Sequence, residues 1–186
     1  MKREKILKRL MGSLQDGFLL TVKRDEGYGF HGVVVGIGAE WILLHTVNTD
    51  IVCFNGYTAL RIEDVKTVKV SALFLSLALA LRGEQPAPSP NVSLASLPEL
   101  LVSADAHFPL LTLHPERLYP DECFIGRVAQ LTEKAVQLRE LDVHATWRKR
   151  LHRHRLKDIT RVDFGGGYEN ALWKLAKHDI SHNEPS

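Results

Sequence analysis

Short runs of apolar and β-branched residues, separated by turn residues, recur along this chain and predict a mainly β fold. Residues 30–37 are rich in valine and glycine, residues 38–40 suit a turn, and residues 41–44 supply a return strand. Two such runs joined by a short turn predict a β-hairpin. Residues 124–130 and 136–139 repeat this plan with a cleaner alternation of apolar and polar positions, as expected for half-buried strands.

The same pattern occurs twice, at an offset of 94 positions. Residues 30–70 align with residues 124–164 without a gap, and the aligned pairs include Gly32 with Gly126 and Asp64 with Asp158. The apolar positions of one copy coincide with those of the other, which indicates an internal duplication. The residues predicted to point inward are Val34, Leu44, Val68, Val128, Leu138 and Val162.

Segments with helical spacing of apolar residues flank each copy. Residues 5–14 carry an apolar stripe, and residues 97–106 follow Ser96, a favourable N-cap residue. Residues 73–81 and 168–176 are predicted to be helices that follow the last strand of each copy. The proline-rich segment 83–95 is typical of an extended linker. The expected organisation is a first barrel with its helices in 1–82, a linker in 83–95, a second barrel with its helices in 96–180, and a tail in 181–186.

A family resemblance rests on the strand residues of both copies. The first copy contains Phe30-x-Gly32-x-Val34, then Ile42-Leu43-Leu44 and Ile62-x-Asp64-Val65-x-x-Val68; the second contains Phe124-x-Gly126-x-Val128, then Val136-x-Leu138 and Leu156-x-Asp158-Ile159-x-x-Val162. This pattern resembles the Sm-like small barrel, and segment 159–172 also resembles a group of uncharacterised bacterial proteins. The resemblance implies a mainly β fold with flanking helices, built from two Sm-like (Src-homology-type) small five-stranded barrels related by internal duplication.

The RNA-contacting motifs of Sm proteins are not carried over. Those proteins use an Asp-x-x-x-Asn stretch and an Arg-Gly pair, whereas residues 38–42 here read Gly-Ala-Glu-Trp-Ile and Arg61 is followed by Ile62. The resemblance therefore implies a fold and no RNA-binding residue.

Composition and charge narrow the class of protein. The chain has 186 residues, of which 45% are hydrophobic and 25% charged, and this balance excludes disordered and collagen-like chains. Its formal net charge is only +2, which does not by itself indicate a nucleic-acid-binding protein. Cys53 and Cys123 lie in no CxxC pattern, which is typical of a reducing compartment. No apolar run is long enough to span a membrane, so a cytoplasmic protein without a membrane partner is expected.

One strongly basic segment is the main candidate for binding. Residues 147–155 contain five cations, two histidines and a tryptophan, so they could follow a phosphate backbone while the indole stacks on a base. The alternative is a strand whose outer face is charged to prevent edge pairing. The candidate contact residues for an anion or nucleic acid are Trp147, Arg148, Lys149, Arg150, Arg153 and Arg155.

Other candidate chemistry has a simpler structural explanation. His152 and His154 share one strand face, but neighbouring arginines would repel a metal dication, so no metal or cofactor is expected. Residues 165–167 are three glycines before a helix, and they are interpreted as a C-terminal turn rather than a phosphate loop. Cys123 is interpreted as a small buried hydrophobe. Asp64 and Asp158 are expected to fix matching turns through backbone N–H groups.

These observations favour a non-catalytic binding or assembly protein, with a protein partner or self-association expected. The alternative is an RNA- or DNA-binding protein that uses the basic segment 147–155. An enzyme with a site between the two barrels is the third hypothesis.

Overall fold

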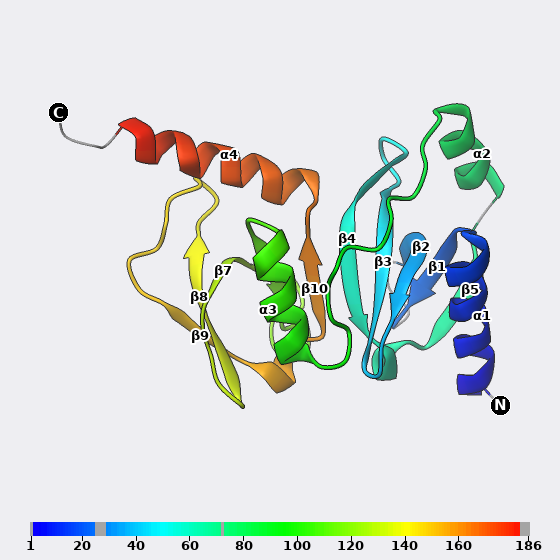
Figure 1. The fold of residues 1–186 in the computed structure, drawn as a ribbon, viewed down its shortest axis with the longest axis horizontal. Coiled ribbons are helices and arrows are strands. Elements are labelled where there is room, and N and C mark those ends of the chain that lie inside the picture. Colours follow the sequence, from blue (N-terminus) through cyan, green and yellow to red (C-terminus); the bar gives the residue numbers. More distant parts are fainter. Residues whose placement is uncertain (1, 25–28, 72, 183–186) are drawn as a thin grey trace.

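A single antiparallel sheet of ten strands forms the centre of the molecule (Figure 1). The computed structural model describes residues 2–24, 29–71 and 73–182. The strand order is β5-β1-β2-β3-β4-β10-β6-β7-β8-β9, so the first five strands form one half of the sheet and the last five form the other. The prediction of a mainly β fold with flanking helices is confirmed.

The two halves contain the same series of elements. The first half consists of α1 (Lys2–Asp16), β1 (Leu20–Lys23), β2 (Phe30–Ile37), β3 (Trp41–Asn48), β4 (Cys53–Arg61), a 3-10 turn (Ile62–Asp64), β5 (Thr67–Val70) and α2 (Leu73–Leu81). The second half consists of α3 (Leu97–His107), β6 (Leu111–His114), β7 (Phe124–Leu131), β8 (Ala135–Leu141), β9 (His152–Arg155), a 3-10 turn (Leu156–Asp158), β10 (Arg161–Phe164) and α4 (Gly167–His182).

Strand register repeats at the offset seen in the sequence. Val34 pairs with Leu44 and Val128 pairs with Leu138, and a bulge follows in both strands at the matching position. Gly32 and Gly126 occupy matching places in β2 and β7, and Asp64 and Asp158 end the two 3-10 turns. The two halves therefore share one strand plan, as the aligned residues predict.

The sheet does not close into two separate barrels as expected. β5 and β9 each pair with one neighbour only, whereas β4 pairs along its length with β10. In that pairing Ala59 lies opposite Val162 and Tyr57 lies opposite Phe164. These apolar residues favour a strand pair inside the molecule over two solvated edges. One continuous sheet therefore joins the two halves.

The hydrophobic core crosses this junction. Trp41, Leu43 and Ala59 of the first half pack in one cluster with Leu100 and other residues of α3. A second cluster, around Leu10, Ile42 and Leu44, belongs to the first half alone. Of the six residues predicted to point inward, five are buried and Val128 is half-buried.

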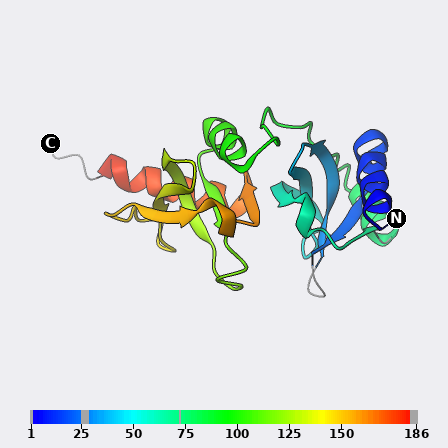
Figure 2. The ribbon, with the colours of Figure 1, turned by 90° about the horizontal axis from the view of Figure 1, so that it is seen from below.

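The helices and the proline-rich segment cover defined parts of the sheet. Seen from below, α1 lies at one end of the molecule and α4 at the other, while α3 lies beside the segment that connects the halves (Figure 2). Ala87 N–H of this segment donates to His45 Nδ1 at 2.9 Å, and the Tyr57 hydroxyl donates to Pro88 C=O at 3.1 Å. The segment therefore lies on the first half. No helix in the described part of the chain is long and apolar enough to cross a membrane.

A buried serine supports the bulge of the first half. The Ser13 hydroxyl accepts a hydrogen bond from Val34 N–H at 3.1 Å and donates to Phe18 C=O at 2.7 Å. Ser13→Ala would leave the buried amide of Val34 without this partner, so the free energy of unfolding should fall by about 1–3 kcal/mol. Urea denaturation measures this. Ser76→Ala, at an exposed position of α2, is the control and should have little effect; equal losses would contradict the prediction.

Candidate interaction surface of the second half

The basic segment is not one continuous strand. Only residues 152–155 form β9, and Trp147 makes an isolated bridge to Leu141, with bends at Lys149 and Arg150 between them. Tertiary packing accompanies this break: the Trp147 ring packs edge-on against Trp173 of α4 and under the guanidinium of Arg139. The expected strand over 147–155 is therefore present only at residues 152–155.

The structure separates the six candidate residues into two groups. Trp147 is half-buried, Arg148 lies 3.6 Å from Glu140, and Arg155 donates to Asp158 at 2.6 Å. Lys149, Arg150 and Arg153 are exposed, and no ion pair within the described residues involves them. Arg139 and Trp173 already contact the indole ring of Trp147, and Lys149, Arg150 and Arg153 carry the charge that no acidic group in the described residues offsets.

His152 and His154 point to the side of β9 opposite to Arg153, and they bind this strand to β8. His152 Nδ1 lies 2.7 Å and His154 Nε2 lies 2.8 Å from the carboxylate of Glu140, whose side chain is 3% exposed. Burial by itself would raise the pKa of Glu140, but the hydrogen bonds and charges of His154 and His152 lower it below its ordinary value. Within the described residues, no set of three metal-ligating side chains is placed to hold an ion. This cluster therefore acts as a tie between β8 and β9.

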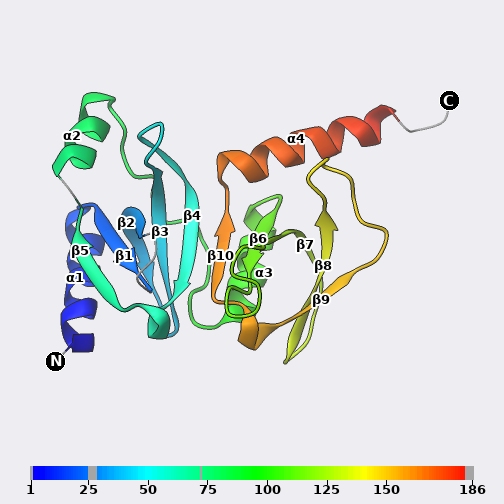
Figure 3. The same ribbon diagram turned by 180° about the vertical axis from the view of Figure 1, so that it is seen from behind.

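Two further arginines extend the cationic surface beyond the basic segment. Arg127 of β7 and Arg139 of β8 are directly opposite each other across the strand pair. Gln137 lies two positions from Arg139 on the same face, and it pairs with Arg153 of β9. We call this set the basic face: Arg127, Gln137, Arg139 and Arg153. It spans three adjacent strands, which the views from the front and from behind show side by side (Figure 3).

The matching face of the first half is apolar and covered. The counterparts of Arg127, Gln137, Arg139 and Arg153 at the offset of 94 are Val33, Leu43, His45 and Ala59. Of these, Val33 packs in the cluster with α2, and Leu43 and Ala59 pack with α3. His45 is stacked between Phe54 and Tyr57 and bonded to Ala87. Burial lowers the pKa of His45, as its role as acceptor requires.

Acidic side chains neutralise only part of the positive charge of the basic face. Arg127 lies 3.2 Å from Asp105 of α3, and Arg139 stacks on Trp147 at 4.9 Å. Arg139 and Arg153 are exposed. Like charges directly opposite across two strands are destabilising; Asp105 offsets the charge of Arg127, whereas no acidic side chain of the described residues pairs with Arg139. Sequence reasoning missed both residues because they lie far from segment 147–155 in the chain; the signal was the 94-position alignment, which sets Arg127 against Val33.

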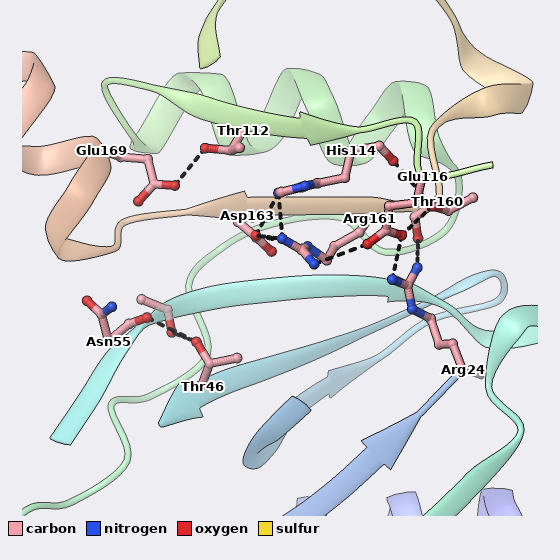
Figure 4. Close-up of polar contacts among 11 residues, drawn as sticks. Arg24, Thr46, Asn55, Thr112, His114, Glu116, Thr160, Arg161, Asp163 and Glu169 are labelled. Carbon is pink, nitrogen blue, oxygen red and sulfur yellow. Dashed lines mark hydrogen bonds and ion pairs between the residues drawn. The ribbon is translucent and has the colours of Figure 1, made fainter. Parts of the chain in front are cut away.

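A charged network fills the junction between the halves (Figure 4). Arg24 of the first half pairs with Glu116, and Glu116 also accepts from Arg161 at 3.1 Å and from the Thr160 hydroxyl at 2.7 Å. Asp163 lies 2.8 Å from His114 and 3.0 Å from Arg161. Burial alone would raise the pKa of Asp163, but His114 and Arg161 lower it. These groups are bound to one another, so they tie the halves together and favour a structural role over catalysis.

The remaining candidate residues have structural roles or none. Cys53 is half-buried and Cys123 is exposed, so the expectation that Cys123 is buried is wrong, although partial burial still raises the pKa of its thiol. Asp64 and Asp158 bind the side chains of Arg117 and Arg155 rather than the predicted backbone groups.

The glycine turn is tied down at both sides. Asn55 Oδ1 accepts from Gly167 N–H at 2.7 Å. Glu169 accepts from the Thr112 hydroxyl at 2.6 Å (Figure 4). The carboxylate in the first turn of α4 disfavours a phosphate there. The structure therefore places no phosphate loop at residues 165–167.

Comparisons of the chain with protein-family models, with curated proteins and with solved structures give no match.

Proposed function

We propose that this chain is a non-catalytic binding protein made of two Sm-like modules, and that the basic face of the second module binds single-stranded nucleic acid. One observation carries the proposal: a sheet face that is apolar and covered in the first half is cationic and exposed in the second. Because both halves share one strand plan, the difference lies in the side chains and not in the fold.

The geometry suits a flexible anionic polymer. Neighbouring strands lie about 4.8 Å apart. Arg127 and Arg139 are opposite each other and Arg153 lies opposite Gln137, so the three arginines are staggered over one face of three adjacent strands. Lys149 and Arg150, exposed in the loop before β9, extend the positive charge beyond these arginines. Gln137 adds amide donors that can bind phosphate oxygens.

Binding through this face should depend little on base sequence. Arginine and lysine contacts to phosphates give affinity without reading bases, and the aromatic ring nearest the face, Trp147, is half-buried against Trp173. The proposal therefore predicts strong salt dependence and weak preference among sequences.

The test is the double variant Arg139→Gln and Arg153→Gln. Two phosphate contacts would be lost, so the slope of log affinity against log salt should decrease by about 1.4 for a single strand. Fluorescence anisotropy with a labelled mixed-sequence RNA, titrated at several salt concentrations, measures this slope. Arg148 is not a suitable target because it contacts the buried Glu140.

The control variant removes the same charge elsewhere. Lys5→Gln with Lys8→Gln changes two exposed residues of α1, at the other end of the molecule, and should keep most of the affinity. Circular dichroism checks that both double variants are folded. Wild-type protein that shows no salt-sensitive binding at micromolar concentration would refute the proposal, and so would equal losses in both variants.

A further inference from the structure

The two free edges of the sheet match the two strands that pair at its centre. By the 94-position register, β9 is the counterpart of β4 and β5 is the counterpart of β10. Inside the chain β4 pairs with β10. At the two ends of the sheet, β9 pairs with β8 and β5 pairs with β1, and the other edge of each strand has no partner among the described strands (Figure 3). A second copy could therefore add its β5 to β9 of the first. Such head-to-tail contacts do not close on themselves unless the rotation forms a ring.

Backbone groups at both edges point in the direction that this pairing requires. Ser71 N–H donates to Leu19 C=O at 2.9 Å, and hydrogen-bonded pairs alternate along an antiparallel ladder. The backbone groups of Val68 therefore turn away from β1, toward the free edge. The bond from Leu156 N–H to Lys134 C=O at 3.0 Å fixes the same alternation in β9, so Arg153 turns its backbone groups outward.

An arginine side chain occupies the edge of β5. The Arg9 guanidinium donates to the outward carbonyl of Val68. In the second half the counterpart of Val68 is Val162, which pairs with Ala59 of β4. Arg9 thus takes the place of a neighbouring strand at this carbonyl.

The helix position of Arg9 has a different residue in the second half. α1 and β1 precede α3 and β6 by 91 positions, as shown by Leu20 and Leu111, which pair with Gly32 and Gly126. At this offset, Leu100 of α3 is the counterpart of Arg9. Leu100 is fully buried in the core that the two halves share. The helix position is therefore apolar (Leu100) where the second half packs against the first, and charged (Arg9) at the free end of the sheet.

The edge of β9 shows the same replacement. Arg153 is the counterpart of Ala59, which is fully buried in the central pairing. If β9 met β5 of a second copy in the central register, Arg153 would lie opposite Val68 and His152 opposite Lys69. The guanidinium would have to be buried, and burial of an unpaired charge is costly. Charged side chains at sheet edges are a common protection against edge pairing.

An apolar pair at the two edges is nevertheless in place. Val70 and Leu151 are the counterparts of Phe164 and Tyr57, which lie opposite each other in the central pairing. Their side chains are 65% and 47% exposed. The two edges therefore keep an apolar pair that could contribute to an interface with a second copy. Arg9 and Arg153 oppose the formation of that interface.

We propose that Arg9 and Arg153 prevent head-to-tail association of this chain with a second copy of itself, in which β9 would pair with β5 in the register of β4 with β10. In this proposal the wild-type chain stays monomeric. Without the two arginines, copies of the chain would join head to tail into open-ended oligomers.

The experiment replaces both arginines and measures the oligomeric state without nucleic acid. Arg9→Leu with Arg153→Ala makes both edges similar to the central pairing. Arg9→Met with Arg153→Ala is the second variant, because methionine keeps an unbranched apolar side chain on α1 if leucine disturbs the helix. Sedimentation velocity over a 100-fold range of concentration should show a monomeric wild type and a variant that forms dimers, trimers and longer species.

The control is Lys8→Leu with Lys157→Ala, which removes two exposed cations from the same two regions without opening an edge. It should remain monomeric. Arginine variants that are folded by circular dichroism but stay monomeric would overturn the proposal, as would a wild type that already forms open-ended oligomers or a control that assembles equally. Because no nucleic acid is present, the outcome is independent of the binding function proposed above.

Discussion

Trp41→Ala is expected to lower the free energy of unfolding by about 3–5 kcal/mol, the range for truncating a large aromatic residue in a core. The Trp41 side chain is fully buried and packs in the cluster that both halves share. The indole N–H has no acceptor within the described residues, so the loss comes from packing and not from a broken hydrogen bond. The stack of Arg61 on the ring, at 5.4 Å, would also be lost.

Urea denaturation followed by circular dichroism measures this change. Since the damaged core belongs to both halves, wild type and variant should each unfold in a single transition, with the midpoint of the variant shifted to lower urea. Val143→Ala, at a position that is 76% exposed, is the control and should change stability by less than about 0.5 kcal/mol. A loss below 1 kcal/mol in Trp41→Ala, or two separate transitions in the wild type, would contradict the shared core.

Glu140→Ala should cost about 1–3 kcal/mol at pH 7, because it removes a buried carboxylate and leaves His152 and His154 without their hydrogen-bond acceptor. The groups that face this carboxylate are His152, His154 and Arg148. The truncation should loosen β9 in particular, so backbone amides of residues 152–155 should lose protection from hydrogen exchange. Glu133→Ala, at an exposed turn position, is the control.

The effect of Glu140→Ala should also depend on pH. The pKa of Glu140 is lowered in the folded protein, so its contribution is fully present above the pKa of the unfolded chain, about 4.3. It is lost as pH falls through the lower folded value. Urea denaturation at pH 5 and pH 3 should therefore show a smaller difference between wild type and variant at pH 3 than at pH 5. A difference that grows on acidification would show that the carboxylate does not stabilise the fold.

Much of the local structure was predictable because it depends on neighbouring residues. The hairpin of residues 30–44, the helix at 73–81 and the cap at Ser96, whose side chain accepts from Glu99 N–H, follow from short-range patterns. The internal repeat predicted that Gly32 matches Gly126 and that Asp64 matches Asp158, because the same spacing of apolar residues sets the same register; the bulges beside Val34 and Val128 were not predicted.

The arrangement of the halves was not predictable in this way. The pairing of β4 with β10 brings together segments about 100 positions apart, and alternation within each strand says nothing about which edge meets which. Arg127 and Arg139 belong to the basic face only because their strands lie beside β9. Segment 147–155 was expected to continue as a strand, but its first residues are drawn toward Trp173 of α4, a contact between distant parts of the sequence.

The central position of β10 also affects how the protein forms during synthesis. This strand is the last of the ten in the chain, yet it lies between β4 and β6. In a nascent chain that has emerged only as far as β9, β4 pairs with β3 alone, and its other edge, which includes Tyr57 and Ala59, lacks its neighbour β10. Contacts between segments far apart in sequence form slowly. One edge of β4 therefore stays exposed during synthesis until residues 161–164 have left the ribosome exit tunnel, which makes this edge the place where the incomplete chain is most prone to wrong strand pairing.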